Sequence, residues 1–274
     1  MHFSILFHPN KPESPKIAKQ VSDWLQAKGH STWIGNTFNE IEVHEESKKS
    51  ALMIVLGGDG SILRAARFAV PYDTPVLGIN MGRIGFLSET DPDNWAGVLE
   101  QFLNDQHWVE SRLMLRAKLI RDGEVLGDFI ALNDFVIGGT LARVVRLDLS
   151  VDGDEITTYT ADGLIAATPT GSTAYSMAAG GPLLPPSLNN FLLMPVAPYL
   201  SLDRALVLHQ EAEAHVRVRT NHEAILTIDG QDTLELKNSD EIVIYRHDHE
   251  ARFARVGEKG YFYRRLFKRL GFER

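Results

Sequence analysis

An aspartate lies between glycines where a predicted strand gives way to a predicted helix. The stretch IVLGGDGSIL covers residues 54–63, and its turn is Gly57-Gly58-Asp59-Gly60-Ser61. Glycine lets backbone amides approach a phosphate without an intervening side chain, and the start of a helix favours an anion. A carboxylate aimed at that phosphate would be repelled, so we expect Asp59 to face a hydroxyl or a magnesium ion. Phosphoryl transfer requires this combination of a phosphate cradle and a carboxylate that orients the nucleophile or the metal.

The same turn also has an ordinary structural interpretation, because Gly-Asp-Gly is common in tight turns. Neither the Walker A pattern nor the G-x-G-x-x-G fingerprint occurs at this strand, so neither motif explains the glycines. The choice between the functional and the structural interpretation therefore depends on the other motifs in the chain.

Three further segments favour the functional interpretation. GINMGRIGF, residues 78–86, places three glycines after a second buried strand, so we expect a second glycine loop beside the first. Asn133 and Asp134 follow another strand-like segment, although an Asn-Asp pair is also ordinary turn chemistry. TADGLIAATPTGSTAYSMAAGGP, residues 160–182, passes from a strand into a dense set of hydroxyls and free amides. Such a loop suits a polar, planar ligand.

The elements that must position these motifs alternate between strands and helices in the first part of the chain. Residues 3–7, 51–56 and 75–80 are short apolar runs typical of buried strands in a parallel sheet. Residues 14–29 and 62–70 carry the spacing of amphipathic helices. This alternation predicts a doubly wound, Rossmann-like α/β layer, in which ligands bind beyond the carboxyl ends of the strands.

From about residue 112 the hydrophobic period changes from that of helices to that of half-exposed strands. In VRLDLSV, residues 145–151, apolar and polar side chains alternate and lead into an Asp-Gly turn. EAHVRVRT and LTIDGQDTLEL show the same alternation, and the second is predicted to be a hairpin. These patterns predict a β-rich, β-sandwich-like second domain.

The composition limits the classes of protein to consider. The 274 residues include 44% hydrophobic and 23% charged residues, and the formal net charge of −8 argues against broad nucleic-acid binding. The absence of cysteine excludes disulfides, thiolate metal sites and cysteine nucleophiles. The chain has no signal-peptide pattern and no run of about 20 apolar residues, so we expect a cytoplasmic protein without a membrane partner.

Taken together, the motifs resemble those of the NAD kinase family. GGDGS is similar to the family's GGDG motif, GINMGRIGFLSE to its second glycine loop, and ADGLIAATPTGSTAYSMAAGGP to its long signature almost residue for residue. The resemblance covers roughly residues 50–265. It implies an NAD kinase-like fold and the transfer of the γ-phosphoryl group of ATP, or of polyphosphate, to the adenosine 2′-hydroxyl of NAD. The product is NADP.

The resemblance also implies roles for individual residues. Asp59 is the catalytic proton acceptor, and an ordinary carboxylate is so weak a base that it accepts the proton only as the new bond forms. The residues implied to bind NAD are Asp59, Gly60, Arg64, Asn133, Asp134, Arg143, Thr160, Asp162, Thr173, Ala174, Tyr175, Ser176, Met177, Ala178, Ala197 and Gln231. The implied phosphate-donor loop contains Gly57, Gly58, Gly60 and Ser61. The family usually has glutamate where this chain has Asp134.

We therefore expect three segments. Residues 1–110 form the α/β domain with the GGDG loop, residues 111–250 the β-rich NAD-binding domain, and residues 251–274 a C-terminal segment whose helix packs back on the α/β domain. The apolar residues expected on one face of that helix are Tyr263, Leu266, Phe267 and Leu270.

The resemblance further implies a divalent cation, Mg²⁺, for which no side-chain ligands are assigned, and a homodimer or homotetramer. NAD and ATP are the small-molecule partners, and no nucleic-acid partner is expected. Two alternatives stay open at this point. A lipid or sugar kinase shares the GGDG turn but leaves residues 168–182 unexplained. A dinucleotide-binding regulator without catalysis would need no carboxylate at Asp59.

Overall fold

The computed structural model describes residues 1–82, 85–140 and 143–271, and the chain divides into two compact units. The first unit contains Met1–Ser111 and His249–Arg274, and the second contains Arg112–Asp248. Among the described residues, no helix has both the length and the apolar character needed to cross a bilayer.

The first unit is built on a largely parallel sheet with the strand order β2-β1-β3-β4-β18-β5. Its strands are β1 (His2–Phe7), β2 (Ser31–Asn36), β3 (Leu52–Gly57), β4 (Val76–Asn80), β5 (Trp108–Arg112) and β18 (Ala251–Arg255). Its helices are α1 (Ser14–Ala27), α2 (Glu40–Ser47), α3 (Asp59–Ala69), α4 (Trp95–Leu103) and α6 (Phe262–Arg269), with the 3-10 turn η1 (Val70–Tyr72).

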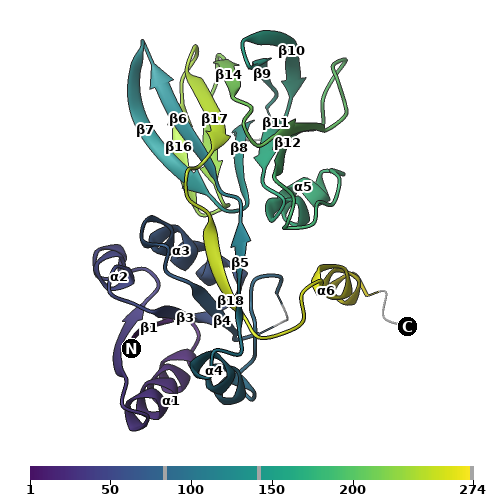
Figure 1. Ribbon diagram of the computed structural model, residues 1–274. Coiled ribbons are helices and arrows are strands. Elements are labelled where there is room, and N and C mark those ends of the chain that lie inside the picture. Colours follow the sequence, from purple (N-terminus) through teal and green to yellow (C-terminus); the bar gives the residue numbers. More distant parts are fainter. Residues whose placement is uncertain (83–84, 141–142, 272–274) are drawn as a thin grey trace. The chain divides into compact units, whose positions relative to one another are not determined.

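Helices cover both faces of this sheet, with α1 and α4 on one side and α2 and α3 on the other (Figure 1). β3 is buried at every position because helices pack on both of its faces, which explains its unbroken apolar run. The core on the side of α1 and α4 includes Ile54, Val21 and Leu99. The doubly wound α/β prediction is confirmed.

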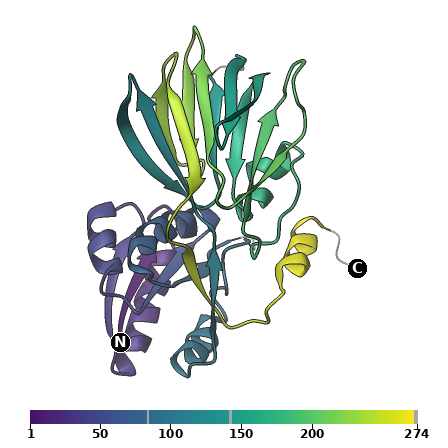
Figure 2. The same ribbon diagram turned by 45° about the horizontal axis from the view of Figure 1, so that its top comes forward.

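In the described part of the second unit, two antiparallel sheets pack face to face (Figure 2). One has the order β10-β9-β14-β17-β6-β7, and the other the order β13-β12-β11-β8-β15-β16. The strands are β6 (Leu115–Arg121), β7 (Glu124–Ala131), β8 (Asp134–Gly139), β9 (Val145–Val151), β10 (Asp154–Ala161), β11 (Gly163–Ala167), β12 (Asn190–Val196), β13 (Leu206–His209), β14 (Ala214–Arg219), β15 (Ala224–Ile228), β16 (Asp232–Leu236) and β17 (Glu241–Arg246). Short turns of helix, η2 (Gly171–Thr173) and α5 (Tyr175–Ala178), follow β11.

The alternation seen in the sequence determines which side chains enter the core between these sheets. Val145, Leu147 and Leu149 of β9 are buried there, while Arg146 between them is exposed. The facing sheet contributes Phe135 and other apolar residues to the same core. The prediction of a β-rich, sandwich-like domain is confirmed.

The C-terminal helix α6 buries a different face from the predicted one. Of the four residues expected on one apolar face, only Leu266 is buried, and Tyr263, Phe267 and Leu270 are more than 40% exposed. The helix instead turns Phe262 and Leu266, one helical turn apart, toward Phe86. The prediction of the buried face was therefore wrong: the buried side is centred on Phe262 and Leu266.

Candidate active site

The GGDG turn connects β3 to α3 at the carboxyl end of a buried parallel strand. Gly57 is the last residue of β3, and Gly58 precedes the helix in an extended conformation with φ −95° and ψ −176°. The helix begins at Asp59, three residues before the predicted range of 62–70, because the amides of Ser61 and Ile62 already bond to the Gly58 carbonyl at 3.0 and 3.2 Å. The first turn of α3 therefore presents backbone amides where an anion is favoured.

The carboxylate of Asp59 is bound by the second glycine loop. The amide of Phe86 donates to Oδ2 at 2.9 Å, and the amide of Leu87 donates to Oδ1 at 3.1 Å. A side chain at Gly85 would overlap with this carboxylate, so the approach of the two loops requires glycine there. The prediction that the two glycine loops lie side by side is confirmed, and Asp59 is the residue that joins them.

The remaining residues predicted around this turn have different surroundings. A side chain at Gly57 would overlap with Ser61, whose buried hydroxyl has no hydrogen-bond partner among the described residues. Gly60 is exposed at the start of the helix. The guanidinium of Arg64 lies 5.0 Å from the ring centroid of Phe38 and 3.5 Å from the carboxylate of Glu40. The position of Arg64 is thus set by residues at the start of α2.

In the second unit, the backbone of the Asn133-Asp134 pair is held by Asp229. Its carboxylate accepts the amides of Leu132 at 3.1 Å, Asn133 at 2.7 Å and Asp134 at 3.2 Å. Asp229 begins the Asp-Gly turn between β15 and β16, with φ 50°. Gln231, which the resemblance implies as an NAD contact, follows in the same turn and donates its amide to the Ile228 carbonyl.

Asp134 is the most perturbed acid in this group. It is 4% exposed, and burial together with the nearby charge of Asp229 raises its pKa to about 7. The backbone amide of Tyr175 donates to the same carboxyl and partly opposes the rise in pKa. Asp134 therefore changes its charge near neutral pH, where many nucleotide-dependent enzymes work.

The loop after β11 wraps closely around the backbone of Asn133. The hydroxyl of Thr168 donates to the Leu132 carbonyl at 2.5 Å, and its amide donates to the Asn133 carbonyl at 2.9 Å. A side chain at Gly171 would overlap with that Asn133 carbonyl. The loop from Thr173 to Ala178 is therefore tied to the Asn133-Asp134 pair at one end of β11.

Within this loop the implied NAD-binding residues range from buried to exposed. Thr173 is buried and donates its hydroxyl to the Thr170 carbonyl at 3.0 Å. The buried hydroxyl of Ser176 has no hydrogen-bond partner among the described residues. Tyr175 is 46% exposed, and Ala178 is also exposed, whereas Ala174 and Met177 are half-buried. The loop thus combines a fixed backbone with accessible side chains.

A second group of predicted residues lies at the opposite end of β11. Asp162 precedes this five-residue strand and Thr168 follows it, so a distance of roughly 20 Å separates the two residues. The Asp162 amide bonds to the Val196 carbonyl at 3.0 Å, next to Ala197, which has φ 46°. Thr160 accepts the Tyr199 amide at 2.7 Å. The predicted residues of the second unit therefore form two groups rather than one.

Arg143 is placed near the second group. Its amide bonds to the Thr140 carbonyl at 3.1 Å, and its side chain is exposed. A side chain at Gly139 would overlap with the Arg143 carbonyl, while the Gly139 amide bonds to the Asp162 carbonyl at 3.1 Å. Gly139 therefore links Arg143 to Asp162.

Several residues that organise the site were not identified from the sequence. Asp229 belongs to the IDGQ segment, whose Asp-Gly turn signals a positive φ but gives no indication of three amide partners. Nothing in the sequence indicates that the amides of Phe86 and Leu87 bind Asp59, because almost every residue type has a backbone amide. Gly171 could have been noticed as a glycine within a hydroxyl-rich loop.

The described residues contain no cluster of three or more His, Asp or Glu side chains that could hold a metal ion. His247 and His249, whose H-x-H spacing invites a metal interpretation, belong to no such cluster. The side chains that the structure describes therefore do not form a complete metal site, and none of them is assigned as a ligand to a cation.

The titration of Asp134 leads to a prediction about stability. Its folded pKa of about 7 exceeds the ordinary value of 3.8, so the folded chain holds a proton that the unfolded chain has released between these values. The contribution of this group to the free energy of unfolding is complete below the unfolded pKa of 3.8 and is lost as pH rises to the folded pKa of about 7. Asp134→Asn removes this dependence, because asparagine does not titrate.

Urea unfolding of both proteins at about pH 5 and about pH 8 measures the effect. The wild-type chain should lose about 2 to 3 kcal/mol more than the variant over that interval. Parallel pH dependence of the two proteins would show that Asp134 does not titrate in this window.

Comparisons with known proteins show which family the chain is similar to. A sequence model described as the ATP-NAD kinase N-terminal domain matches residues 3–107, and one described as the ATP-NAD kinase C-terminal domain matches residues 132–256. A curated NAD kinase from Chloroflexus aggregans is 37% identical over 268 residues, which is 97% of each chain. One from Koribacter versatilis is 39% identical over 277 residues, which is 97% of this chain and 96% of the other.

Two solved structures share the fold. An NAD kinase from Archaeoglobus fulgidus in complex with ATP is similar with a TM-score of 0.79 and 26% identity, covering 100% of both chains. Yeast NADH kinase complexed with NADH is similar with a TM-score of 0.88 and 24% identity, covering 100% of this chain and 88% of the other.

Proposed function

The chain belongs to the NAD kinase family, and from this membership we infer that it is an NAD kinase. It transfers the γ-phosphoryl group of ATP to the adenosine 2′-hydroxyl of NAD, so that NADP and ADP form. Polyphosphate is proposed as an alternative donor. The observation that carries the proposal is the position of Asp59, the first residue of α3, whose carboxylate accepts the amides of Phe86 and Leu87.

Asp59 orients the acceptor hydroxyl in this reaction. A carboxylate has about four lone-pair positions, so accepting two amides is compatible with a further contact to a ribose hydroxyl. The hydroxyl proton passes to Asp59 as the bond to phosphorus forms, because an ordinary carboxylate is too weak a base to remove it beforehand. The fixed amides prevent the carboxylate from rotating away from its substrate.

The first turn of α3 receives the donor phosphates. No bulky side chain stands in front of the amides of this turn, because its residues include Gly57, Gly58, Gly60 and Ser61. The partial positive charge at the start of the helix stabilises the phosphate oxygens, while Asp59 remains directed at the acceptor.

The second unit, within the proposed NAD-binding domain of residues 111–250, holds the dinucleotide. The Asn133-Asp134 pair contacts ribose hydroxyls, since a carboxylate can accept two neighbouring hydroxyls at once. The further residues proposed to contact NAD are Arg143, Thr160, Asp162, Thr173, Ala174, Tyr175, Ser176, Met177, Ala178, Ala197 and Gln231, with Gly60 and Arg64 from the first unit.

A divalent cation, Mg²⁺, is proposed to enter the site bound to the phosphates of ATP. A cation there neutralises charge on the transferring group. The described side chains form no metal cage, so no protein ligand to the cation is proposed.

The proposed cellular setting is the cytoplasm, and the proposed assembly is a homodimer or homotetramer. Both proposals rest only on the resemblance of the chain to the NAD kinase family. Light scattering coupled to gel filtration gives the mass in solution, and a mass of one chain of 30.6 kDa would contradict the assembly.

Incubation of the purified chain with ATP, Mg²⁺ and NAD, followed by an NADP-specific dehydrogenase, tests the function. NADP should form only when both substrates are present. Phosphorylation of a lipid or sugar in preference to NAD would favour the alternative that the chain is a lipid or sugar kinase with the GGDG turn. Binding of NAD without any NADP formation would favour a regulator. Replacing ATP with polyphosphate in the same assay tests the alternative donor.

A further inference from the structure

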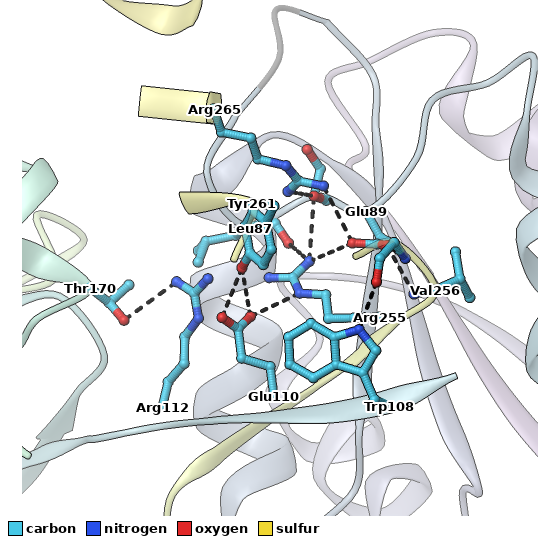
Figure 3. A network of polar contacts seen from close by, with 12 residues as sticks. Leu87, Glu89, Trp108, Glu110, Arg112, Thr170, Arg255, Val256, Tyr261 and Arg265 are labelled. Atoms are coloured by element: carbon cyan, nitrogen blue, oxygen red, sulfur yellow. Dashed lines mark hydrogen bonds and ion pairs between the residues drawn. The ribbon is translucent and has the colours of Figure 1, made fainter. Parts of the chain in front are cut away.

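A buried arginine from the end of the chain contacts the loop that holds Asp59. Arg255, the last residue of β18, is 1% exposed. Its Nη1 donates to the Leu87 carbonyl at 2.9 Å and the Ser88 carbonyl at 3.4 Å (Figure 3). The same group lies 3.1 Å from Glu89, and Nε donates to Glu110 at 2.9 Å. One guanidinium thus connects two carbonyls and two carboxylates.

Leu87 is the link between this arginine and the proposed catalytic carboxylate. Its amide donates to Asp59 at 3.1 Å, and its carbonyl accepts from Arg255 at 2.9 Å. Only one residue therefore separates the guanidinium from the carboxylate, and movement of Leu87 would change the direction in which Asp59 points.

The partners of Arg255 are themselves fixed. Glu89 accepts the next two backbone amides after Arg255, each at 3.0 Å. Glu110 accepts the Tyr261 hydroxyl at 2.8 and 2.7 Å (Figure 3). Arg265 of α6 donates to the Ser88 carbonyl at 2.5 Å. The carbonyls of Leu87 and Ser88 thus accept hydrogen bonds from arginines of both β18 and α6.

The other amide donor to Asp59 is held by apolar packing. The side chain of Phe86 is buried in a cluster with Phe262 and Leu266 of α6. Each residue whose amide binds Asp59 therefore contacts the C-terminal segment, Phe86 through its side chain and Leu87 through its carbonyl.

Stability alone is a weak explanation for these buried charges. Removing an arginine and two carboxylates from water is costly, and apolar residues of similar volume stabilise a core equally well or better. The guanidinium instead offers several donors in one rigid plane, so it fixes the directions of its acceptors. Such a group suits a loop whose backbone must be held within a fraction of an ångström of a productive geometry.

We propose that Arg255, assisted by Arg265, is a positioning residue for Asp59, acting through the backbone of Leu87 and Ser88. The proposal rests on the proposed role of Asp59 in phosphoryl transfer. The residue does not touch the substrate, and its effect on the reaction is transmitted by the two loop amides.

Arg255→Lys provides the first test. Lysine keeps the positive charge but has a single nitrogen, which cannot contact the loop carbonyls and Glu110 in the same arrangement. At a temperature where circular dichroism shows the variant folded, kcat for NADP formation should fall about 10- to 100-fold. The KM for NAD and its calorimetric Kd should stay within about twofold. An unchanged kcat in the folded variant would overturn the proposal.

A double variant separates positioning from a general structural defect. If Arg255 acts through Asp59, adding Arg255→Lys to Asp59→Asn should change the residual kcat by less than about twofold. A further 10- to 100-fold loss would show an independent effect and overturn the proposal. Near-normal turnover of Asp59→Asn alone would instead refute the proposed role of Asp59. A nearly inactive Asp59→Asn beside an unaffected Arg255→Lys would refute only the positioning.

Arg265→Gln keeps the proposal testable if Arg255→Lys does not fold. The Arg265 side chain is 23% exposed, so its replacement is milder, and kcat should fall about 3- to 10-fold at constant KM. Unchanged turnover in this variant would overturn the proposal in that case. Arg121→Lys is the matched control, because Arg121 forms a fork with buried Asp240 at 2.7 and 2.8 Å in the second unit. Its kcat should be that of the wild type.

Discussion

Asp59→Asn should lower kcat for NADP formation by about 1,000-fold while NAD binds with nearly unchanged affinity. The amide side chain retains the size of the carboxylate but cannot take up the proton of the acceptor hydroxyl. It also places an NH₂ group against one of the two amides, of Phe86 or Leu87, that donate to the wild-type carboxylate. Both effects act on the reaction step, whereas most residues proposed to bind NAD belong to the second unit.

Initial rates by the coupled dehydrogenase assay and NAD titration by calorimetry give the two quantities separately. Asp23→Asn is a suitable control, because Asp23 is an exposed acid on α1 whose carboxylate pairs with Lys19 at 3.0 Å. The control should retain full activity. Turnover of Asp59→Asn within about tenfold of the wild type would remove Asp59 from the reaction step.

Asp229→Ala should destabilise the second unit by about 3 to 5 kcal/mol. Its carboxylate accepts the amides of Leu132, Asn133 and Asp134, and a buried amide without an acceptor is costly. Alanine also tolerates the positive φ of 50° at this position less well than aspartate does. Loss of the negative charge relieves its repulsion with Asp134, which offsets part of the cost.

Urea unfolding compares this variant with Asp152→Ala. Asp152 has φ 51°, also begins an Asp-Gly turn, and accepts one amide, that of Glu213 at 2.8 Å, in an exposed position. The control reproduces the backbone strain without the three amides, so its loss should be about 1 kcal/mol. Equal losses in the two variants would show that the three amide bonds contribute nothing beyond the turn.

The strands expected from the sequence were predictable because each obeys a simple local rule. The run of apolar residues in β3 indicates a strand buried on both faces, and the alternation in β9 indicates a strand buried on one. The candidate site was predictable where it consists of glycines, hydroxyls and acids at fixed spacing. The turn around Asp59 and the loop after β11 are of this kind.

The contacts that organise the site were not predictable, because they join residues far apart in the sequence. The amides that bind Asp59 come from Phe86 and Leu87, 27 and 28 residues later. Arg255 contacts Leu87 across 168 residues. A basic residue at the end of a short strand carries no signal that it will be buried.

The structure of the chain with bound NAD tests the central claim most directly, through the distance between the Asp59 carboxylate and the adenosine 2′-oxygen. We expect a hydrogen-bond distance of about 2.6 to 3.2 Å. A separation beyond about 6 Å, with the ligand fully occupied, would contradict the assignment of Asp59 to the acceptor hydroxyl.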